Sequence, residues 1–143
     1  KRHNFQSREK TYDLFRYGLS FFFILLCCFF YYMTFFPKAN GEKIMLLLLG
    51  ILIIGIGNYM PRLPQNYFLG IKTPWTLSNE YVWQKTHKIG GYSFVIVGII
   101  IAVYGLLELP YSFIVVIVGL LIDAVFSFIY SYIVFKRIET EKD

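Results

Sequence analysis

The chain has 143 residues, of which 57% are hydrophobic and only 16% charged, and its mean hydropathy is +0.55. Soluble domains contain about 45–50% apolar and about 25% charged residues, so the composition excludes an ordinary soluble domain. The net charge of +5 does not indicate direct nucleic-acid binding, because the basic residues fall in the gaps between apolar runs, where membrane topology accounts for them.

Four long apolar runs follow one another, at residues 17–36, 44–60, 89–107 and 111–135. A helix that crosses a bilayer needs about 20 apolar residues, with a range near 17–25. All four runs qualify, and none shows the period-two alternation of a barrel strand. We therefore expect an all-α integral membrane protein with four transmembrane helices, as one domain over residues 1–143. Because it begins with Lys1 rather than Met, the chain is also expected to be processed or cut from a longer one.

The distribution of basic residues predicts one orientation. Twelve of the fourteen lie in the N-terminal arm, in the segment between the second and third runs, or in the C-terminal tail. The two other connections hold only Lys38 and Lys43. The positive-inside rule then places both termini and the central loop in the cytoplasm of a multi-pass cell-membrane protein.

The loop between the second and third runs, residues 58–88, is the most distinctive part of the chain. Its first half cannot be a continuous helix because it contains Pro61, Pro64 and Pro74. Gly70 permits a tight bend or a positive φ. We expect this loop to fold back on the mouth of the bundle and to hold a fixed shape.

A short interfacial helix is expected after Pro74, with Thr76 or Ser78 as its N-cap, and it should run straight into the third span. The helical period places four residues on one face: Val82, Trp83, Thr86 and Ile89. It places four polar residues on another face: Glu80, Gln84, His87 and Lys88.

The loop resembles the signature of the SdpI family of bacterial membrane proteins. The resemblance rests on three runs, Gly57-Asn58-Tyr-Met-Pro-Arg62, Gln65-Asn66-Tyr-Phe-Leu-Gly70-Ile-Lys-Thr-Pro-Trp-Thr-Leu77 and Val82-Trp83-Gln-Lys-Thr-His87-Lys-Ile-Gly-Gly91. It covers about residues 44–107. In its core Lys72 stands where the family often has Arg, which keeps the charge but loses the bidentate geometry of a guanidinium.

This resemblance implies a membrane immunity protein. The best-known member protects its own cell from a secreted sporulation-delaying peptide toxin and holds a cytoplasmic transcriptional repressor at the membrane once toxin is present. The resemblance thus implies the toxin and a repressor as partners, beside the lipid bilayer. The motif residues expected to carry binding are Asn58, Arg62, Asn66, Gly70, Lys72, Thr73, Pro74, Trp75, Thr76, Trp83 and His87.

A simpler interpretation of the loop stays open, namely an aromatic and basic belt at the lipid headgroups. Separately from this belt, an aromatic and basic loop beside a polar stripe in the fourth run supports an alternative function, that of a lipid- or amphiphile-binding membrane protein or a small transporter. The loop residues would then matter for bound lipid rather than for toxin resistance.

The fourth run carries a single acid, Asp123. An acid at mid-span costs about 2.5–3.5 kcal/mol on insertion scales, so it should face protein or a cavity. It belongs to a stripe at helical spacing, formed by Gly119, Asp123, Ser127 and Tyr130. We interpret Asp123 and Ser127 as an intramembrane polar contact, while a coupled proton or ion site stays open as the alternative.

The third run carries small residues at sevenfold spacing, Gly91, Gly98 and Gly105, which allow two helices to approach closely. Gly98 and Asp123 lie at nearly equal distances from the turn near Pro110. We therefore expect the glycine stripe to pack beside the Asp123 stripe, with Asp123 hydrogen-bonded across the bundle.

Catalysis is not expected, because no Gly-x-Ser-x-Gly, HExxH or phosphate-loop motif is present. Glu80 and His87 are seven residues apart, whereas helical metal ligands usually lie three or four apart. The adjacent Cys27 and Cys28 diverge by about 100° on a helix and cannot chelate together. The sequence predicts no catalytic residue, no metal site and no cofactor.

Overall fold

The computed structural model describes the backbone of residues 2–141 and the side chains of residue 13 and of residues 15–141. Four long helices dominate this part: α1 (Arg2–Phe35), α2 (Gly41–Tyr59), α4 (Glu80–Leu107) and α5 (Ser112–Thr140). Between α2 and α4 lie a 3-10 turn, η1 (Met60–Arg62), and a short helix, α3 (Pro74–Ser78). Residues 2–141 contain no strand.

The four helices contain segments long and apolar enough to cross a membrane: Phe15–Phe35, Gly41–Arg62, Glu80–Leu107 and Ser112–Thr140. The predicted four-span, all-helical membrane protein is therefore confirmed. Three of the helices extend well beyond the apolar runs that predicted them, and α4 begins at Glu80 rather than at residue 89. The polar arm before residue 17 continues α1, and the polar tail after residue 135 continues α5 to Thr140.

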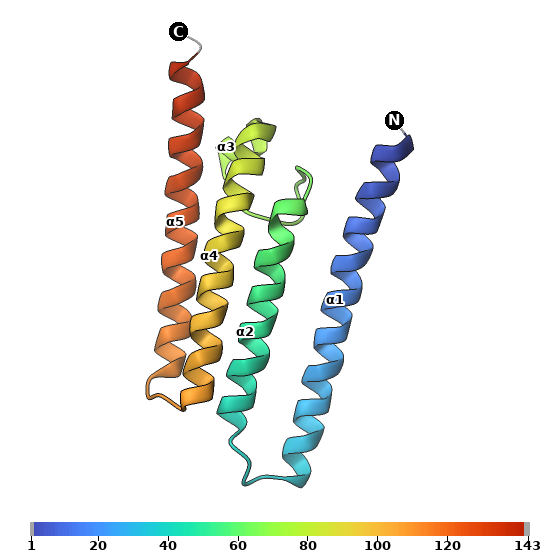
Figure 1. Cartoon of the computed structure of the whole chain (residues 1–143), viewed down its shortest axis with the longest axis vertical. Helices are drawn as coiled ribbons and strands as arrows, with labels where there is room; N and C mark the ends of the chain where they lie inside the picture. Colours follow the sequence, from blue (N-terminus) through green and yellow to red (C-terminus); the bar gives the residue numbers. More distant parts are fainter. Residues whose placement is uncertain (1, 142–143) are drawn as a thin grey trace.

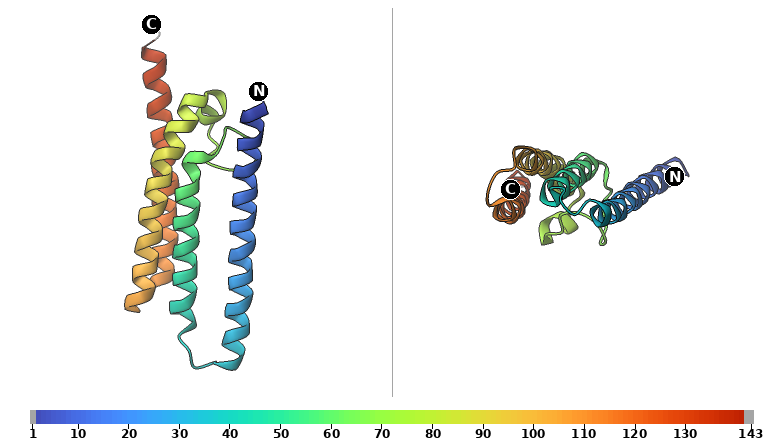
Figure 2. Two further views of the ribbon diagram at one scale, coloured as in Figure 1. Left: turned by 45° about the vertical axis from the view of Figure 1, so that its right-hand side comes forward. Right: turned by 90° about the horizontal axis from the view of Figure 1, so that it is seen from below.

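The helices run alternately up and down, with α4 between α2 and α5, and with α1 beside α2 (Figures 1 and 2). α1 begins and α5 ends at the same end of the bundle, where the loop between α2 and α4 also lies (Figure 1). Of the basic residues that predicted the orientation, Lys1 and Lys142 lie outside the described residues, as do the side chains of Arg2, Arg8 and Lys10.

The closest helix contact joins α4 to α2, and glycines on both helices create it. A Cβ on Gly98 would lie 2.8 Å from the carbonyl oxygen of Gly50, and one on Gly57 would lie 2.6 Å from that of Gly91. At the opposite end of the bundle, a Cβ on Gly105 would lie 2.8 Å from the Cβ of Leu46. The two backbones therefore touch directly, which only small residues permit.

The prediction that this glycine stripe packs beside Asp123 is wrong. The stripe of α4 meets the glycines of α2, and Gly50 and Gly57 have the same sevenfold spacing as Gly91 and Gly98. Asp123 instead faces another side of α4, where Ser93 lies. The matching registers of α2 and α4 explain the pairing, because two glycine rows with one period can interlock along their length.

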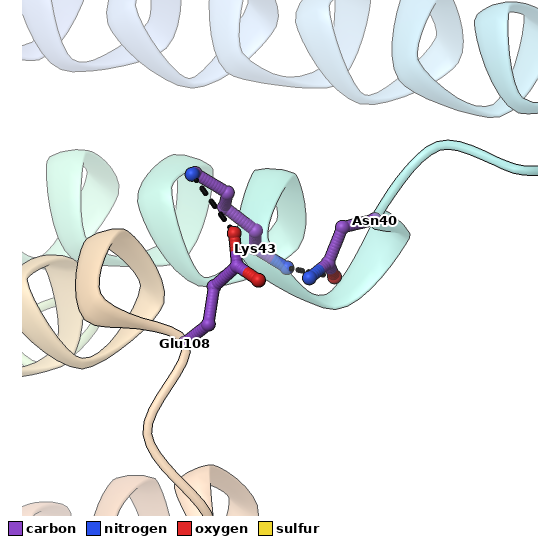
Figure 3. Close-up of polar contacts among 3 residues, drawn as sticks. All are labelled: Asn40, Lys43 and Glu108. Carbon is purple, nitrogen blue, oxygen red and sulfur yellow. Dashed lines mark hydrogen bonds and ion pairs between the residues drawn. The ribbon is translucent and has the colours of Figure 1, made fainter.

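The opposite end of the bundle is closed by polar contacts between helix ends. Lys43 of α2 forms a 3.0 Å ion pair with Glu108 (Figure 3). Glu108 follows α4 directly and has a left-handed backbone (φ 52°). Asn40 caps α2, because its side chain accepts the backbone N–H of Lys43 at 3.1 Å. Ser112 donates to the carboxylate of Glu42. The hydrogen bond and the charge of Lys43 lower the pKa of the Glu108 carboxyl below its ordinary value.

Candidate functional site

The loop between α2 and α4, here called the central segment (residues 60–79), is held to the start of α4 by His87. Its Nε2 atom accepts the backbone N–H of Ile71 at 2.9 Å, and its Nδ1 atom lies 2.9 Å from the carbonyl oxygen of Trp83. An amide N–H can only donate and a carbonyl oxygen can only accept, so the ring is neutral with its proton on Nδ1. Both ring nitrogens are therefore engaged within the protein.

Gly70 allows the central segment to reach this histidine. Its φ is +114°, and a Cβ at this position would collide with His87 Nε2 and lie 3.1 Å from Trp83. The two rings of Trp83 and His87 stack at 3.9 Å, both are fully buried, and Trp83 Nε1 donates to the carbonyl oxygen of Leu63 at 2.8 Å. Gly70, Trp83 and His87 thus form one unit, here called the latch.

The structure differs from the predicted faces of the helix at His87. Val82, Trp83 and Thr86 are buried together as expected, but His87, assigned to the polar face, is also completely buried. The helical period did not reveal this because the cover comes from a distant loop. Burial of an imidazole is tolerated here because both nitrogens are hydrogen-bonded.

The expected single helix after Pro74 is in fact two helices, and the predicted N-caps are wrong. Thr73 caps α3, with Pro74 at the first helical position, and its hydroxyl accepts the N–H of Thr76 at 3.2 Å. Asn79 then leaves the helical region (φ −140°, ψ 120°) and caps α4 by accepting the N–H groups of Tyr81 and Val82. Proline fits the first position because its missing N–H would have no partner there.

Two polar side chains fix the remaining turns of the central segment. Asn66 Oδ1 accepts the N–H groups of Phe68 and Leu69, at 2.8 and 2.7 Å, while its amide donates to the carbonyl oxygen of Pro64. Gln65 donates to the carbonyl oxygens of Thr76 and Leu77, near the C-terminal end of α3. The segment is thereby ordered by its own hydrogen bonds, as the sequence predicted for a loop of fixed shape.

The central segment also contacts α5. Thr73 Oγ1 lies 3.1 Å from Ser131 Oγ in a buried hydrogen bond. The indole of Trp75 packs against the rings of Phe128 and Tyr132, with centroids 5.1 and 5.0 Å away. These contacts bring Thr73, Trp75 and Thr76 together at the end of the α4–α5 pair.

Other predicted binding residues lie elsewhere. Lys72 and Pro74 are exposed on the surface of the central segment, as are the neighbouring aromatic residues Tyr67 and Phe68. Asn58 and Arg62 lie at a groove between α1 and α2. The motif residues are thus divided between the latch, the contact with α5, the turns and exposed surface of the central segment, and this groove.

A row of buried polar side chains runs along the inner face of α5, at Asp123, Ser127 and Ser131. Ser93 of α4 donates to Asp123, as the expected hydrogen bond across the bundle requires. Within the described part of the chain, Asp123 Oδ2, Ser127 Oγ and Thr86 Oγ1 are buried without a hydrogen-bond partner. The row continues to Ser131 rather than to the half-buried Tyr130. We call it the polar column.

The structural roles of four residues in this region were not predicted from the sequence, namely those of Gln65, Asn79, Ser93 and Ser131. The spacing of 123, 127 and 131 would have indicated Ser131, since positions four apart share a helix face. Ser93 and Gln65 act through tertiary contacts that no local pattern announces. Among the described residues, no group of three His, Cys, Asp or Glu side chains lies close enough to hold a metal ion.

Comparison with known proteins places this region in a family. Residues 62–131 match the model of the SdpI/YfhL protein family. The chain is also 35% identical, over 101 residues, to the immunity protein SdpI of Bacillus subtilis (strain 168). The matched residues are 71% of this chain and 49% of that protein, so the chain spans about half the length of this relative. No solved structure matches significantly.

Proposed function

Because the chain belongs to the SdpI family, we propose that it is a membrane immunity protein that protects a bacterium from a secreted antimicrobial peptide toxin. The observation that carries the proposal is the overlap between the residues that match the family and the site described above. The residues that match the family, 62–131, begin within the central segment and contain the latch, the polar column and the Thr73–Ser131 contact between the central segment and the polar column. An enzymatic role is not proposed, because this family is not a known enzyme family.

We further propose that the termini and the central segment face the cytoplasm. Twelve of the fourteen basic residues lie in these parts of the sequence, and the positive-inside rule favours the cytoplasmic side for them. The connections at the opposite end are short, with α1 and α2 separated by residues 36–40 and α4 and α5 by residues 108–111. They offer little surface, so the toxin would be met by the membrane-facing sides of the helices.

The cytoplasmic half of the role would be the capture of a transcriptional repressor by the central segment. Tyr67 and Phe68 are 75% and 85% exposed, and Lys72 in the same segment is also exposed. Residues 67–72 are here called the tip. Asn66 holds the backbone of this tip in place. A rigid aromatic and basic tip on the membrane surface suits the binding of a soluble partner, since exposed aromatic residues are typical of interface centres.

Expression of the chain in a toxin-sensitive bacterium tests the immunity proposal. The intact chain should restore growth in the presence of the toxin. This protection should be weaker in the variants Trp75→Ala, Asn66→Ala and Asp123→Ala. Glu139→Ala is the control, because Glu139 is exposed in the polar end of α5, away from the proposed toxin surface and outside the described side-chain contacts. Absence of protection by the intact chain, when it is present in the membrane, would contradict the proposal.

The repressor proposal is tested separately by the location of a fluorescent repressor. It should move to the membrane in toxin-treated cells that express the intact chain. The double variant Tyr67→Ala, Phe68→Ala should lose this recruitment while it still protects the cell. Unchanged recruitment by the double variant would exclude this tip as the binding surface.

A further inference from the structure

A groove of about 420 Å³ lies between α1 and α2, outside the contacts that build the latch and the polar column. α1 lies beside α2 on the side away from α4 and α5 (Figures 1 and 2). The groove is lined mainly by apolar side chains of both helices, including Leu19, Phe22, Leu25, Ile51, Leu52 and Ile56. Its volume falls in the range typical of small-molecule sites, about 300–1,000 Å³.

The groove has the depth of a single leaflet. On α1 its lining runs from Phe15 to Leu25, and on the other side it runs from Ile51 of α2 to Arg62 of η1. At a rise of about 1.5 Å per residue, ten residues of α1 span about 15 Å. The hydrocarbon core is about 30 Å thick, so the groove occupies the half of the bilayer on the side of the central segment.

The end of the groove nearest the central segment is polar and positively charged. Arg62 and Asn58 line it there, and both are exposed. Among the described residues Arg62 forms no ion pair, whereas Arg16 of α1 is paired with Asp13 at 3.0 Å. A guanidinium at the membrane surface is well suited to a phosphate, because its planar fork makes two parallel hydrogen bonds.

We propose that this groove binds one anionic phospholipid, with an acyl chain between α1 and α2 and the headgroup phosphate at Arg62. The groove fits this lipid in both length and charge. Its apolar part is about one leaflet deep, and it ends at Arg62, which has no ion pair with any residue whose side chain the structure describes. A spanning peptide helix would need about 20 residues and the full thickness of the core, which this slot does not provide. The inference does not depend on the immunity proposal.

Two glycines give access to the groove without disturbing the bundle. Gly18 of α1 and Gly55 of α2 both line it, and a Cβ built on either meets no atom within 4 Å. A leucine at either position would therefore extend into the groove and take the place of the acyl chain. The glycines that join α2 to α4 are the opposite case, because they have no such room.

The test is retention of lipid by the purified full chain, measured by native mass spectrometry after reconstitution in mixed vesicles of phosphatidylglycerol and phosphatidylcholine. The intact chain should retain one phosphatidylglycerol in preference to phosphatidylcholine. Arg62→Gln should reduce this preference about fivefold, as expected for one basic residue at a membrane surface. Gly55→Leu, and independently Gly18→Leu, should abolish retention.

Matched controls separate the groove from the general membrane surface. Arg137→Gln removes an exposed arginine of α5, and Ala124→Leu adds the same side chain to an exposed position of α5. Both should retain lipid as the intact chain does. A phosphatidylglycerol with a photoreactive acyl chain should label residues 15–25 and 51–62 more than α5.

Three results would overturn the proposal. Equal retention of the two lipids by the intact chain would show no headgroup selection. Equal labelling of α5 would indicate ordinary surrounding lipid only. Efficient disulfide formation between two copies of Gly55→Cys, in a chain lacking Cys27 and Cys28, would show that a second copy occupies the groove instead.

Discussion

α4 packs against α2 and against α5 by two different kinds of contact. Towards α2 the helix presents glycines, and the two backbones touch so closely that no side chain fits between them. Towards α5 it presents Ser93 and the small residue Gly90, against Asp123 and Ser127. In a bilayer the hydrophobic effect does not drive helices together, so close backbone packing and polar contacts are the available means. The face of α4 towards α2, here called the glycine face, should therefore be sensitive to added side-chain volume. The face towards α5, here called the polar face, should be sensitive to the loss of particular polar atoms.

The largest effect is expected from Gly98→Leu on the glycine face. A Cβ at Gly98 would lie 2.8 Å from the carbonyl oxygen of Gly50 and 2.9 Å from the backbone nitrogen of Ile54, so the helices must separate. The free energy of unfolding should fall by about 3 kcal/mol, at the upper end of typical overpacking costs. Thermal unfolding in detergent micelles, followed by circular dichroism, measures this change.

Gly55→Leu is the matched control for that change, because it makes the same substitution on α2 where a Cβ meets nothing within 4 Å. Its unfolding temperature should stay close to that of the intact chain. Equal destabilisation by the two substitutions would show that the glycine face of α4 is not a tight contact.

The next effect is expected from His87→Phe, at the end of α4 where the central segment is attached. Phenylalanine leaves the N–H of Ile71 and the carbonyl oxygen of Trp83 without their side-chain partner. An unmade hydrogen bond at a buried group costs about 1–3 kcal/mol. The central segment should open, so trypsin should cut faster at the exposed Lys72. Lys88→Gln, beside His87 but exposed, should leave the cleavage rate unchanged.

A smaller effect is expected from Asp123→Ala on the polar face. The change removes the acceptor for Ser93, and interhelical hydrogen bonds in membranes contribute about 0.6–1.7 kcal/mol. Asp123→Asn keeps an acceptor oxygen at the same place and should lose less stability than the alanine variant. If both variants unfold like the intact chain, the polar column does not hold α5 to α4.

The smallest effect is expected at the opposite end, from the ion pair of Lys43 with Glu108. The pKa of Glu108 is lowered in the folded chain by the hydrogen bond and charge of Lys43, so the stabilisation is present above the unfolded pKa and is lost as pH falls through the folded pKa. Because the two side chains are 37% and 52% exposed, solvent should screen the pair and the effect should be small. Intact chain and Glu108→Gln should differ slightly in unfolding temperature at neutral pH and converge in acid. A difference that grows in acid would contradict this assignment.

The four spans could be predicted from the sequence because they are set by length and hydropathy alone. The partner of the glycine stripe could not be predicted from one helix considered by itself. The spacing of Gly50 and Gly57 in the second span matches that of Gly91 and Gly98, and only this comparison indicates which helix the stripe contacts. Proximity to the turn near Pro110 favoured α5 instead, and was misleading for this face.

At the site, the composition of the central segment predicted a fixed shape, and the hydrogen bonds of Asn66 and Gln65 confirm it. The burial of His87 was not predictable from helical periodicity, because it depends on a bend at Gly70 that brings Ile71 over the ring. Local spacing identifies the faces of a helix, but not which face a distant loop will cover. The role of the motif residues in binding stays a prediction.

The immunity proposal and the role of the latch are tested together by the survival of toxin-treated, toxin-sensitive cells. The cells express either the intact chain or Gly70→Ala at equal membrane levels. Gly70→Ala should break the latch, because its φ is +114° and a Cβ would collide with His87. The intact chain and the control Gly18→Ala should protect the cells, and Gly70→Ala should not. Full protection by Gly70→Ala would contradict the role of the latch in immunity, and no protection by the intact chain would contradict the immunity proposal.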